Sequence, residues 1–237
     1  MEEFIEYTRI PGIGQPAPEF DVDTTLGRRS LGGYRGHWLI LFSHPADFTP
    51  VCSSEFVAFA DAYPEFQKLN CELLGLSIDS KFSHLAWVQN LEDEVGAEIP
   101  FPIIDDVSMA VSDAYGMLQP GASETATVRG VFVIDPVGIM RAILYYPIST
   151  GRSVSEILRL VRALQMTDEH GLASPEGWRP GENAIVPPPK TLDEARSQAH
   201  TARIRQDEGW HYRTWYWCER PVDAANEGDA RSEAKSR

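Results

Sequence analysis

The feature that most constrains the fold is a series of short apolar runs, each with the length of one buried strand. They cover residues 38–43, 73–78, 102–105 and 130–135. Because apolar and polar residues do not alternate within these runs, the runs predict strands covered on both faces of a sheet. Other segments place apolar residues at helical spacing and predict helices. These helical segments are residues 50–69, 82–92 and 153–167.

The chain turns back on itself after the last of these apolar runs. Residues 132–135 and 139–146 flank Pro136 and Gly138, a pattern that predicts a hairpin. Strand–helix–strand units give parallel pairs, whereas a hairpin gives an antiparallel pair. We therefore expect an α/β domain with a mixed sheet flanked by helices.

The composition changes after the last of these helical segments, where proline becomes frequent. A stiff spacer of three prolines, 187–189, precedes an aromatic segment at 210–218. We expect a domain over residues 1–168, a C-terminal arm over 169–221 and a loose tail over 222–237. The arm is expected to build no core of its own, so its aromatic residues need another surface, in the same subunit or in a partner.

The chain is strongly acidic. Its 35 acidic residues against 21 Lys and Arg leave a net charge of −14 with histidine neutral. Such a protein repels phosphate backbones, which excludes nucleic acid as a partner. No apolar run approaches the ~18 residues of a membrane span, and the N-terminal segment lacks the basic start and apolar stretch of a signal peptide. We expect no membrane contact and a cytoplasmic protein.

The chain has three cysteines, Cys52, Cys71 and Cys218, and no CxxC pair. An odd number of cysteines in a chain of this size does not suggest a disulfide framework. Without a CxxC pair, neither a zinc ribbon nor a thioredoxin-type redox pair is available. Each thiol therefore has to be interpreted from its neighbours.

The segment from Ser43 to Cys52 joins a predicted buried strand to a predicted helix. Thr49 suits the N-cap and Pro50 the first helical position, which places Cys52 third in the helix. Free amides and the helix dipole favour the anionic form of a thiol in the first turn. We expect the Thr49 hydroxyl to accept a hydrogen bond from a first-turn amide and so to lie near the sulfur. Most lone cysteines are small buried apolar residues, but these neighbours favour a reactive thiol.

Two arginines are candidates for the cation that would stabilise a thiolate. Arg129 precedes the apolar run 130–135 and so lies at the mouth of a predicted strand, and Arg152 lies just before the last predicted helix of the domain. A single arginine is more often a surface residue. The residues alone leave the choice open.

Pro45, Thr49 and Cys52 form the pattern Pro-x-x-x-Thr-x-x-Cys, which resembles the active-site signature of the peroxiredoxins. The surrounding FSHPADFTPVCSSEF is similar to the subfamily of the one-Cys enzymes and their long archaeal relatives. ELLGLSID, FPIIDD, TVRGVFVID, LYYPISTGRS and GWRPG extend the resemblance over roughly residues 12–220. The resemblance implies a thioredoxin-like fold and a peroxidase that reduces hydrogen peroxide and organic hydroperoxides with no metal or organic cofactor.

The resemblance carries functional roles to Pro45, Thr49, Cys52 and Arg129. The Cys52 thiolate would attack the peroxide and become a sulfenic acid. Thr49 and Arg129 would stabilise the charge that moves to the leaving oxygen, and Pro45 would shield the sulfur from water. His44 either donates to the departing oxygen or is a satisfied histidine at a strand end.

The other two cysteines have different contexts. Cys71 enters an apolar run and is expected to pack in the core. Cys218 closes the aromatic cluster of the arm. In the long archaeal members that this chain resembles, a cysteine in a similar setting forms a disulfide with the peroxidatic cysteine of a neighbouring subunit. Cys218 is therefore either a resolving thiol or an inert thiol packed among tryptophans.

The resemblance also implies a thiol reductant such as thioredoxin and a homo-oligomer, either a dimer or a ring of ten subunits built from dimers. Two other classes of protein would use the same oxidisable Cys52: a peroxide sensor that signals to a partner, and an oligomeric holdase. Thr49 and Arg129 favour the enzyme, because turnover needs them and a bare sensor does not.

Overall fold

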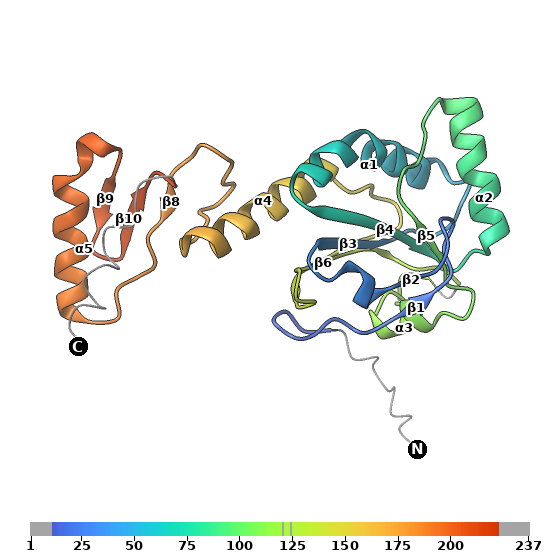
Figure 1. The fold of residues 1–237 in the computed structure, drawn as a ribbon, viewed down its shortest axis with the longest axis horizontal. Helices are drawn as coiled ribbons and strands as arrows, with labels where there is room; N and C mark the ends of the chain where they lie inside the picture. Colours follow the sequence, from blue (N-terminus) through green and yellow to red (C-terminus); the bar gives the residue numbers. More distant parts are fainter. Residues whose placement is uncertain (1–10, 120, 124, 223–237) are drawn as a thin grey trace, which may run out of the picture. The chain divides into compact units, whose positions relative to one another are not determined.

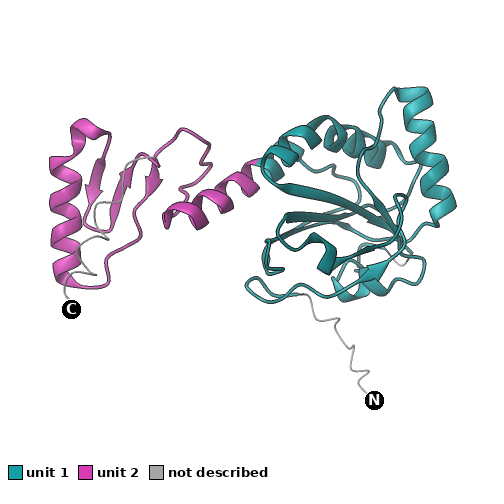
Figure 2. Cartoon of the chain, viewed as in Figure 1, with its two compact units in different colours: residues 1–158 teal, residues 159–237 magenta. Residues whose placement is uncertain are grey.

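The computed structural model describes residues 11–119, 121–123 and 125–222. The chain divides into two compact units, residues 1–158 and 159–237 (Figure 2). The boundary between the two units falls inside helix α4 (Val154–His170), whereas the boundary expected from the sequence follows residue 168. The expected loose tail lies outside the described residues from residue 223 onward.

A five-stranded mixed sheet forms the centre of the first unit (Figure 1). β3, β4 and β5 are parallel, and β6 and β7 are each antiparallel to their neighbour. Their order is β5-β4-β3-β6-β7. The strands cover β3 (Trp38–Ser43), β4 (Cys71–Ser77), β5 (Ile103–Asp105), β6 (Arg129–Ile134) and β7 (Met140–Tyr146). They lie on the predicted apolar runs and hairpin, so the expected α/β class is confirmed.

The predicted helical segments form α1 (Pro50–Lys68), α2 (Lys81–Asn90) and α4. α2 continues into a π-helical turn, η2 (Leu91–Val95), which ends at Gly96 with a φ of 74°. Shorter elements were not predicted, because none is long enough to show a period. They are β1 (Asp21–Val22), β2 (Arg29–Ser30), η1 (Leu31–Tyr34) and α3 (Ala110–Ala114).

Alternate residues of β3 pack on opposite faces of the sheet. Phe42 stacks on Phe59 of α1, with ring centroids 4.2 Å apart, and tilts against Phe56 at 5.3 Å. Leu39 and Leu41 belong to the cluster on the other face. Both faces of β3 are therefore buried, as the unbroken apolar run requires.

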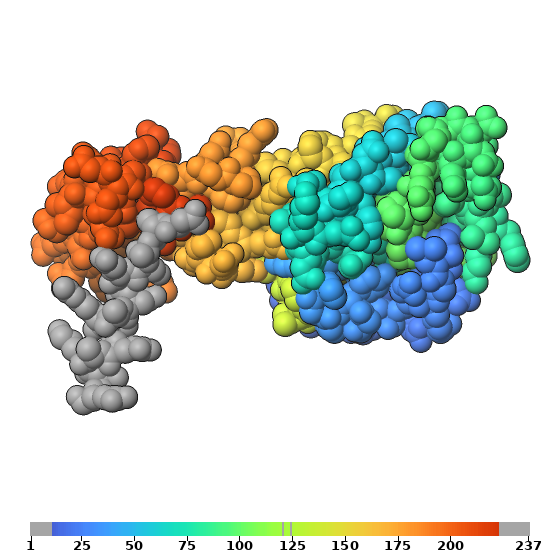
Figure 3. Space-filling model, turned by 45° about the horizontal axis from the view of Figure 1, so that its top comes forward, coloured from blue at the N-terminus to red at the C-terminus, as the bar shows by residue number. Residues whose placement is uncertain are grey.

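The N-terminal segment lies along the outer edge of the sheet. Thr24 forms an antiparallel bridge with Ile104 of β5, and the Thr25 amide donates to the Ile103 carbonyl oxygen at 3.0 Å. Figure 3 shows this blue segment directly against the green segment that includes β5. The contact gives hydrogen-bond partners to the backbone of an edge strand.

The second unit has a three-stranded antiparallel sheet in the order β8-β10-β9, and α5 packs against β9 and β10. The elements cover β8 (Ala184–Ile185), α5 (Leu192–Ile204), η3 (Gln206–Glu208), β9 (His211–Thr214) and β10 (Trp217–Arg220). In the part of the chain that the structure describes, no helix is both long enough and apolar enough to cross a membrane.

The expectation that the C-terminal segment builds no core is wrong. One apolar cluster includes Trp178 and Ala184, and a second joins Ala202, Trp210 and Cys218. Three other aromatic residues are between 42% and 53% exposed: Trp215, Tyr216 and Trp217. The pattern was missed because the strands are two to four residues long and show almost no periodicity.

Candidate active site

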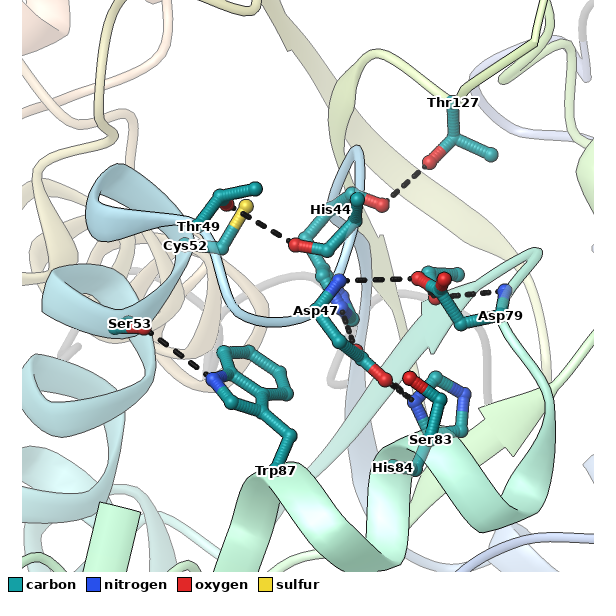
Figure 4. Close-up of polar contacts among 12 residues, drawn as sticks. His44, Asp47, Thr49, Cys52, Ser53, Asp79, Ser83, His84, Trp87 and Thr127 are labelled. Carbon is teal, nitrogen blue, oxygen red and sulfur yellow. Dashed lines mark hydrogen bonds and ion pairs between the residues drawn. The ribbon is translucent and has the colours of Figure 1, made fainter. Parts of the chain in front are cut away.

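Cys52 lies in the first turn of α1, after the loop that leaves the carboxyl end of β3 (Figure 4). Thr49 is the N-cap, with φ −107° and ψ 143°, and Pro50 is the first helical residue. Cys52 is therefore third in the helix, as predicted, and it is fully buried. This position places the thiol near amide groups without helical partners and near the positive end of the helix dipole.

The Thr49 hydroxyl does not cap α1, which corrects the sequence-based expectation. The hydroxyl instead donates to the carbonyl oxygen of Ala46 at 3.0 Å. The chain turns tightly here, with Phe48 in the left-handed region at a φ of 54°. A threonine hydroxyl readily bonds to the carbonyl group three residues earlier. With its hydrogen donated to Ala46, the Thr49 oxygen still has lone pairs that can accept a hydrogen bond.

Arg129 is the cation that contacts the Cys52 thiol. Arg129 is the first residue of β6. Because β6 is antiparallel to β3, this residue lies beside the carboxyl end of β3. Its Nη1 atom donates to Cys52 Sγ at 3.3 Å and to Glu55 Oε2 at 2.8 Å. Its Nε atom donates to the Ile148 carbonyl oxygen at 2.9 Å. Of the two candidate arginines, Arg129 is therefore the one that reaches the sulfur.

Arg152 joins the same buried network through Glu55. Its backbone amide, Nε and Nη2 donate to the two carboxylate oxygens of Glu55 at 2.7, 2.9 and 2.7 Å. Its Nη1 atom donates to the carbonyl oxygens of Ser43, at 2.7 Å, and Gly130, at 2.9 Å. Arg152 therefore connects α1 to the adjoining ends of β3 and β6.

Glu55 is a buried acid on α1 that the sequence analysis missed. Burial raises the pKa of this carboxyl, but the hydrogen bonds and charge of Arg152, with the charge of Arg129, outweigh burial and leave the pKa below its usual range. The carboxylate is an anion bonded to two guanidinium groups. A signal was present, because this acid lies on the apolar face of the predicted helix, between Cys52 and Phe56.

Pro45 and His44 begin the loop between β3 and α1, and both are buried. The His44 ring packs edge-on against Phe56, with centroids 4.8 Å apart. Its Nε2 atom lies 2.9 Å from Asp47 Oδ1, and Asp47 also bonds to Nδ1 of His84 on α2 at 2.9 Å (Figure 4). Burial lowers the pKa of His44 and outweighs the opposing effect of Asp47. Asp47 and His84 were not predicted as site residues.

His44, Asp47 and His84 form the one group, among the residues that the structure describes, whose ligand atoms are close enough to surround a metal ion. These atoms lie within 4.8 Å of one another. One ring nitrogen of each histidine instead bonds to the Asp47 carboxylate, so the contacts within the group form without a cation. We interpret it as a hydrogen-bonded cluster.

Within the described part of the chain, neither of the other two thiols has a guanidinium group in hydrogen-bond contact, since each contacts a backbone carbonyl oxygen. Cys71 begins β4 and is buried, as expected for core packing, and burial together with the charge of Glu72 raises the pKa of its thiol. Cys218 lies in β10 of the second unit, with Sγ 3.5 Å from the Thr214 carbonyl oxygen. Burial also raises the pKa of the Cys218 thiol, against smaller opposing effects of a hydrogen bond and a nearby arginine.

Comparisons with known proteins agree with this geometry. Residues 13–143 match the AhpC/TSA family, and residues 163–201 match the C-terminal domain of 1-Cys peroxiredoxin. A peroxiredoxin of Aquifex aeolicus is 48% identical over 229 residues, which cover 92% of this chain and 100% of that protein.

Solved structures show the same relationship. A yeast mitochondrial 1-Cys peroxiredoxin is similar with a TM-score of 0.76 and 37% identity, covering 90% of this chain and 100% of that one. Peroxiredoxin 6 of Arenicola marina is similar with a TM-score of 0.78 and 29% identity, covering 90% and 99%. These similarities confirm the thioredoxin-like fold that the sequence implied. The chain belongs to the peroxiredoxins of the AhpC/TSA family, which are thiol-dependent peroxidases.

Proposed function

We propose that Cys52 is the nucleophile of this peroxidase. The observation that carries the proposal is the 3.3 Å contact between Arg129 Nη1 and Cys52 Sγ at the start of α1. A guanidinium group and the amides of a helix start both stabilise a thiolate relative to a thiol. The thiolate is the form of cysteine that attacks a peroxide.

In the first half-reaction, the thiolate attacks one oxygen of hydrogen peroxide or of an organic hydroperoxide. The sulfur–oxygen bond forms as the oxygen–oxygen bond breaks, so the sulfur is oxidised to a sulfenic acid and the peroxide is reduced. The leaving hydroxide or alkoxide takes a proton from water. Negative charge moves from the sulfur to the leaving oxygen. Fixed hydrogen-bond donors placed along this path lower the barrier.

Arg129 and Thr49 would both form hydrogen bonds with the reacting atoms, Arg129 as a donor and Thr49 as an acceptor. The Arg129 N–H groups donate to the sulfur before the attack and to the peroxide oxygens during it. The Thr49 oxygen, whose own hydrogen is donated to Ala46, accepts from the peroxide O–H group and orients it. Pro45, which is buried in the same loop, keeps water from the sulfur.

Glu55 and Arg152 are positioning residues in this proposal. The same Nη1 atom of Arg129 contacts both the sulfur and Glu55 Oε2, so the carboxylate decides where the guanidinium lies. Arg152 in turn holds both oxygens of Glu55. A network of buried charges of this kind keeps a single geometry only while every partner is present.

For the second half-reaction, we propose that Cys218 of a neighbouring subunit attacks the sulfenic acid, forming a disulfide and releasing water. A thiol reductant such as thioredoxin then reduces the disulfide. Cys52 and Cys218 are both buried, so the first turn of α1 and β10 must open locally before the Cα atoms can come within about 7 Å. The yeast relative is described with a resolving mechanism via glutathione/thioredoxin systems, so reduction by an external thiol is the alternative.

Non-reducing gels distinguish the two routes. Peroxide without reductant should give a covalent dimer, and either Cys52→Ser or Cys218→Ser should prevent its formation. Monomer with Cys52 over-oxidised to sulfinic acid would contradict the role of Cys218 and assign the second half-reaction to an external thiol.

We further propose that the protein is a cytoplasmic homo-oligomer, with dimers assembled into a decamer. In this proposal residues 1–168 are the peroxidase domain, and residues 169–221 are an arm that takes part in assembly. Trp215, Tyr216 and Trp217 support the assembly, because neighbouring exposed aromatic residues are typical of a contact surface. A monomer in light scattering at micromolar concentration would contradict it.

Peroxide consumption with a thiol donor tests the assignment of Cys52. Cys52→Ser should abolish turnover, and Cys71→Ser, which changes another buried thiol, should retain most of it. Substantial activity of Cys52→Ser would show that another group is the nucleophile. Oxidation of Cys52 without turnover would favour the peroxide sensor, and protection of unfolded clients without turnover would favour the holdase.

A further inference from the structure

The peroxidase reaction leaves the buried cluster of His44, Asp47 and His84 without an assigned role. The three side chains are at most 2% exposed. They connect the loop between β3 and α1 to α2, and the Asp47 backbone amide adds a bond to Asp79 Oδ2 at 3.0 Å (Figure 4). The positions of the protons in this cluster follow from the acceptors around each ring.

His84 has an acceptor at each ring nitrogen. Its Nε2 atom lies 3.1 Å from the Ile104 carbonyl oxygen, which can only accept a hydrogen bond. Its Nδ1 atom lies 3.1 and 2.9 Å from the two carboxylate oxygens of Asp47, a geometry that suits one N–H group shared between two oxygens. Burial raises the pKa of Asp47, but the hydrogen bonds of His44 and His84 outweigh it and leave the pKa well below its usual range. Each ring nitrogen of His84 thus faces an acceptor, and only an imidazolium ring has a hydrogen for both.

His44 is the neutral ring of the cluster. Its Nε2 atom faces the Asp47 carboxylate and must carry the hydrogen of that contact. The ring packs against both Phe56 and Trp87, with centroids 4.8 and 5.1 Å away. Burial of this kind, together with the positive charges of His84 and Arg152, disfavours a second proton. Nδ1 is then a bare lone pair, and no partner is found for this buried atom among the described residues.

We propose that Asp47 and His84 are positioning residues that hold His44 as the neutral Nε2–H tautomer, with its Nδ1 atom kept as a hydrogen-bond acceptor in the active-site loop. His44 in this state cannot donate to the departing oxygen, because its one hydrogen is bonded to Asp47. It can accept a hydrogen bond from an O–H group, such as that of a peroxide or of a sulfenic acid. This inference rests on the proposed function, since it assigns the loop that precedes Cys52 to the peroxidase site.

Imidazole nitrogen NMR measures these proton positions directly. In the reduced, full-length, ¹⁵N-labelled protein at pH 7, we expect two protonated nitrogens on His84. We expect one protonated nitrogen on His44, at Nε2. His84→Asn, which should leave the His44 signals in place, and His44→Gln assign the signals. A neutral His84, or a hydrogen on Nδ1 of His44, would overturn the proposal whether or not Cys52 is the nucleophile.

Two substitutions of His84 separate positioning from simple packing. The amide nitrogen of His84→Asn replaces the Nδ1 donor to Asp47, whereas that of His84→Gln replaces the Nε2 donor to Ile104. We expect His84→Asn to keep the His44 tautomer and His84→Gln to lose it. A purely structural role would give the two variants the same His44 spectrum, with losses only in thermal stability.

Peroxide kinetics complete the test. Asp47→Asn should mix the His44 tautomers and lower the second-order rate constant for peroxide by about tenfold or more, as expected when an acid–base group loses its orientation. The exposed His37→Gln is the matched control and should leave the rate and the cluster signals unchanged. An unchanged rate in folded Asp47→Asn would overturn the role in the reaction. If that variant does not fold, the comparison of His84→Asn with His84→Gln still decides the tautomer.

Discussion

The parallel pair of β3 and β4 has a thiol near each end. Cys71 is the first residue of β4 and pairs with Trp38 at the start of β3, whereas Cys52 follows the carboxyl end of β3. Both thiols are at most 1% exposed. Cys52 lies in a helix start in contact with a guanidinium group, whereas Cys71 lies on strand backbone beside the carboxylate of Glu72.

On the proposed function, this difference implies that the groups buried with a thiol, rather than burial itself, decide its chemistry. Loops and helix starts from several segments meet at the carboxyl ends of parallel strands, so polar groups distant in sequence converge there. Glu55, Arg129 and Arg152 come together at this end of the sheet. At the amino end of the same pair, Cys71 lies in the β-ladder opposite Trp38, where a buried thiol is a small apolar residue.

The largest expected effect is the difference in reactivity between the two thiols. At pH 7 an alkylating reagent should modify Cys52 faster than Cys71 by about 10²-fold or more, because the thiolate is the reactive form and the pKa of Cys71 is raised. A time course of peptide mass spectrometry on the native reduced protein measures both rates. Unfolded protein is the control, in which both thiols should react alike. Equal alkylation rates of Cys52 and Cys71 in the native protein would contradict the expected difference in reactivity between the two ends of the strand pair.

Removing the guanidinium beside Cys52 should have the next largest effect. Arg129→Ala should slow the reaction with peroxide by about 10²-fold or more, as for the loss of a fixed donor to the transition state. Stopped-flow kinetics with hydrogen peroxide measures this, and the exposed Arg28→Ala is the matched control. Unchanged kinetics would mean that the 3.3 Å contact of Arg129 does not serve the reaction.

The smallest effect is expected at the amino end. Cys71→Ser puts a hydroxyl in an apolar position and should cost about 1 kcal/mol of unfolding free energy, with the peroxide rate unchanged. Denaturant unfolding gives the free energy, and Cys71→Ala, which adds no polar atom, separates the loss of sulfur from the burial of a hydroxyl. A slower peroxide reaction in Cys71→Ser would show that the two ends of the strand pair are coupled.

Sequence patterns predicted the part of this molecule that depends on local periodicity. The apolar runs located β3, β4, β5 and β6, and the N-cap pattern placed Cys52 in the first turn of α1. The sheet of the second unit was missed, because strands of two to four residues show almost no period.

The contacts of the site were harder to predict than its position. Thr49 fits an N-cap, yet its hydroxyl donates to Ala46, because a tight turn brings that carbonyl group within reach. Asp47 meets His84, from another segment, only through folding. Such long-range pairs have no local pattern, although a charged residue on an apolar helix face, as at Glu55, is a usable sign of a buried partner.

The network around Cys52 also has a consequence for the net charge of the site during the catalytic cycle. If Cys52 is the thiolate of the proposed function, the guanidinium groups of Arg129 and Arg152 are balanced by that thiolate and by the carboxylate of Glu55, and the reduced site is electroneutral. A sulfenic acid is uncharged, so oxidation leaves one positive charge without a counter-ion in a buried region. Opening of the first turn of α1 would relieve this imbalance by hydration, and further oxidation to an anionic sulfinate would relieve it by restoring a negative charge. On the proposed function, the arrangement that favours the thiolate would therefore make the oxidised site the less stable electrostatic state, and opening and over-oxidation would compete to relieve it.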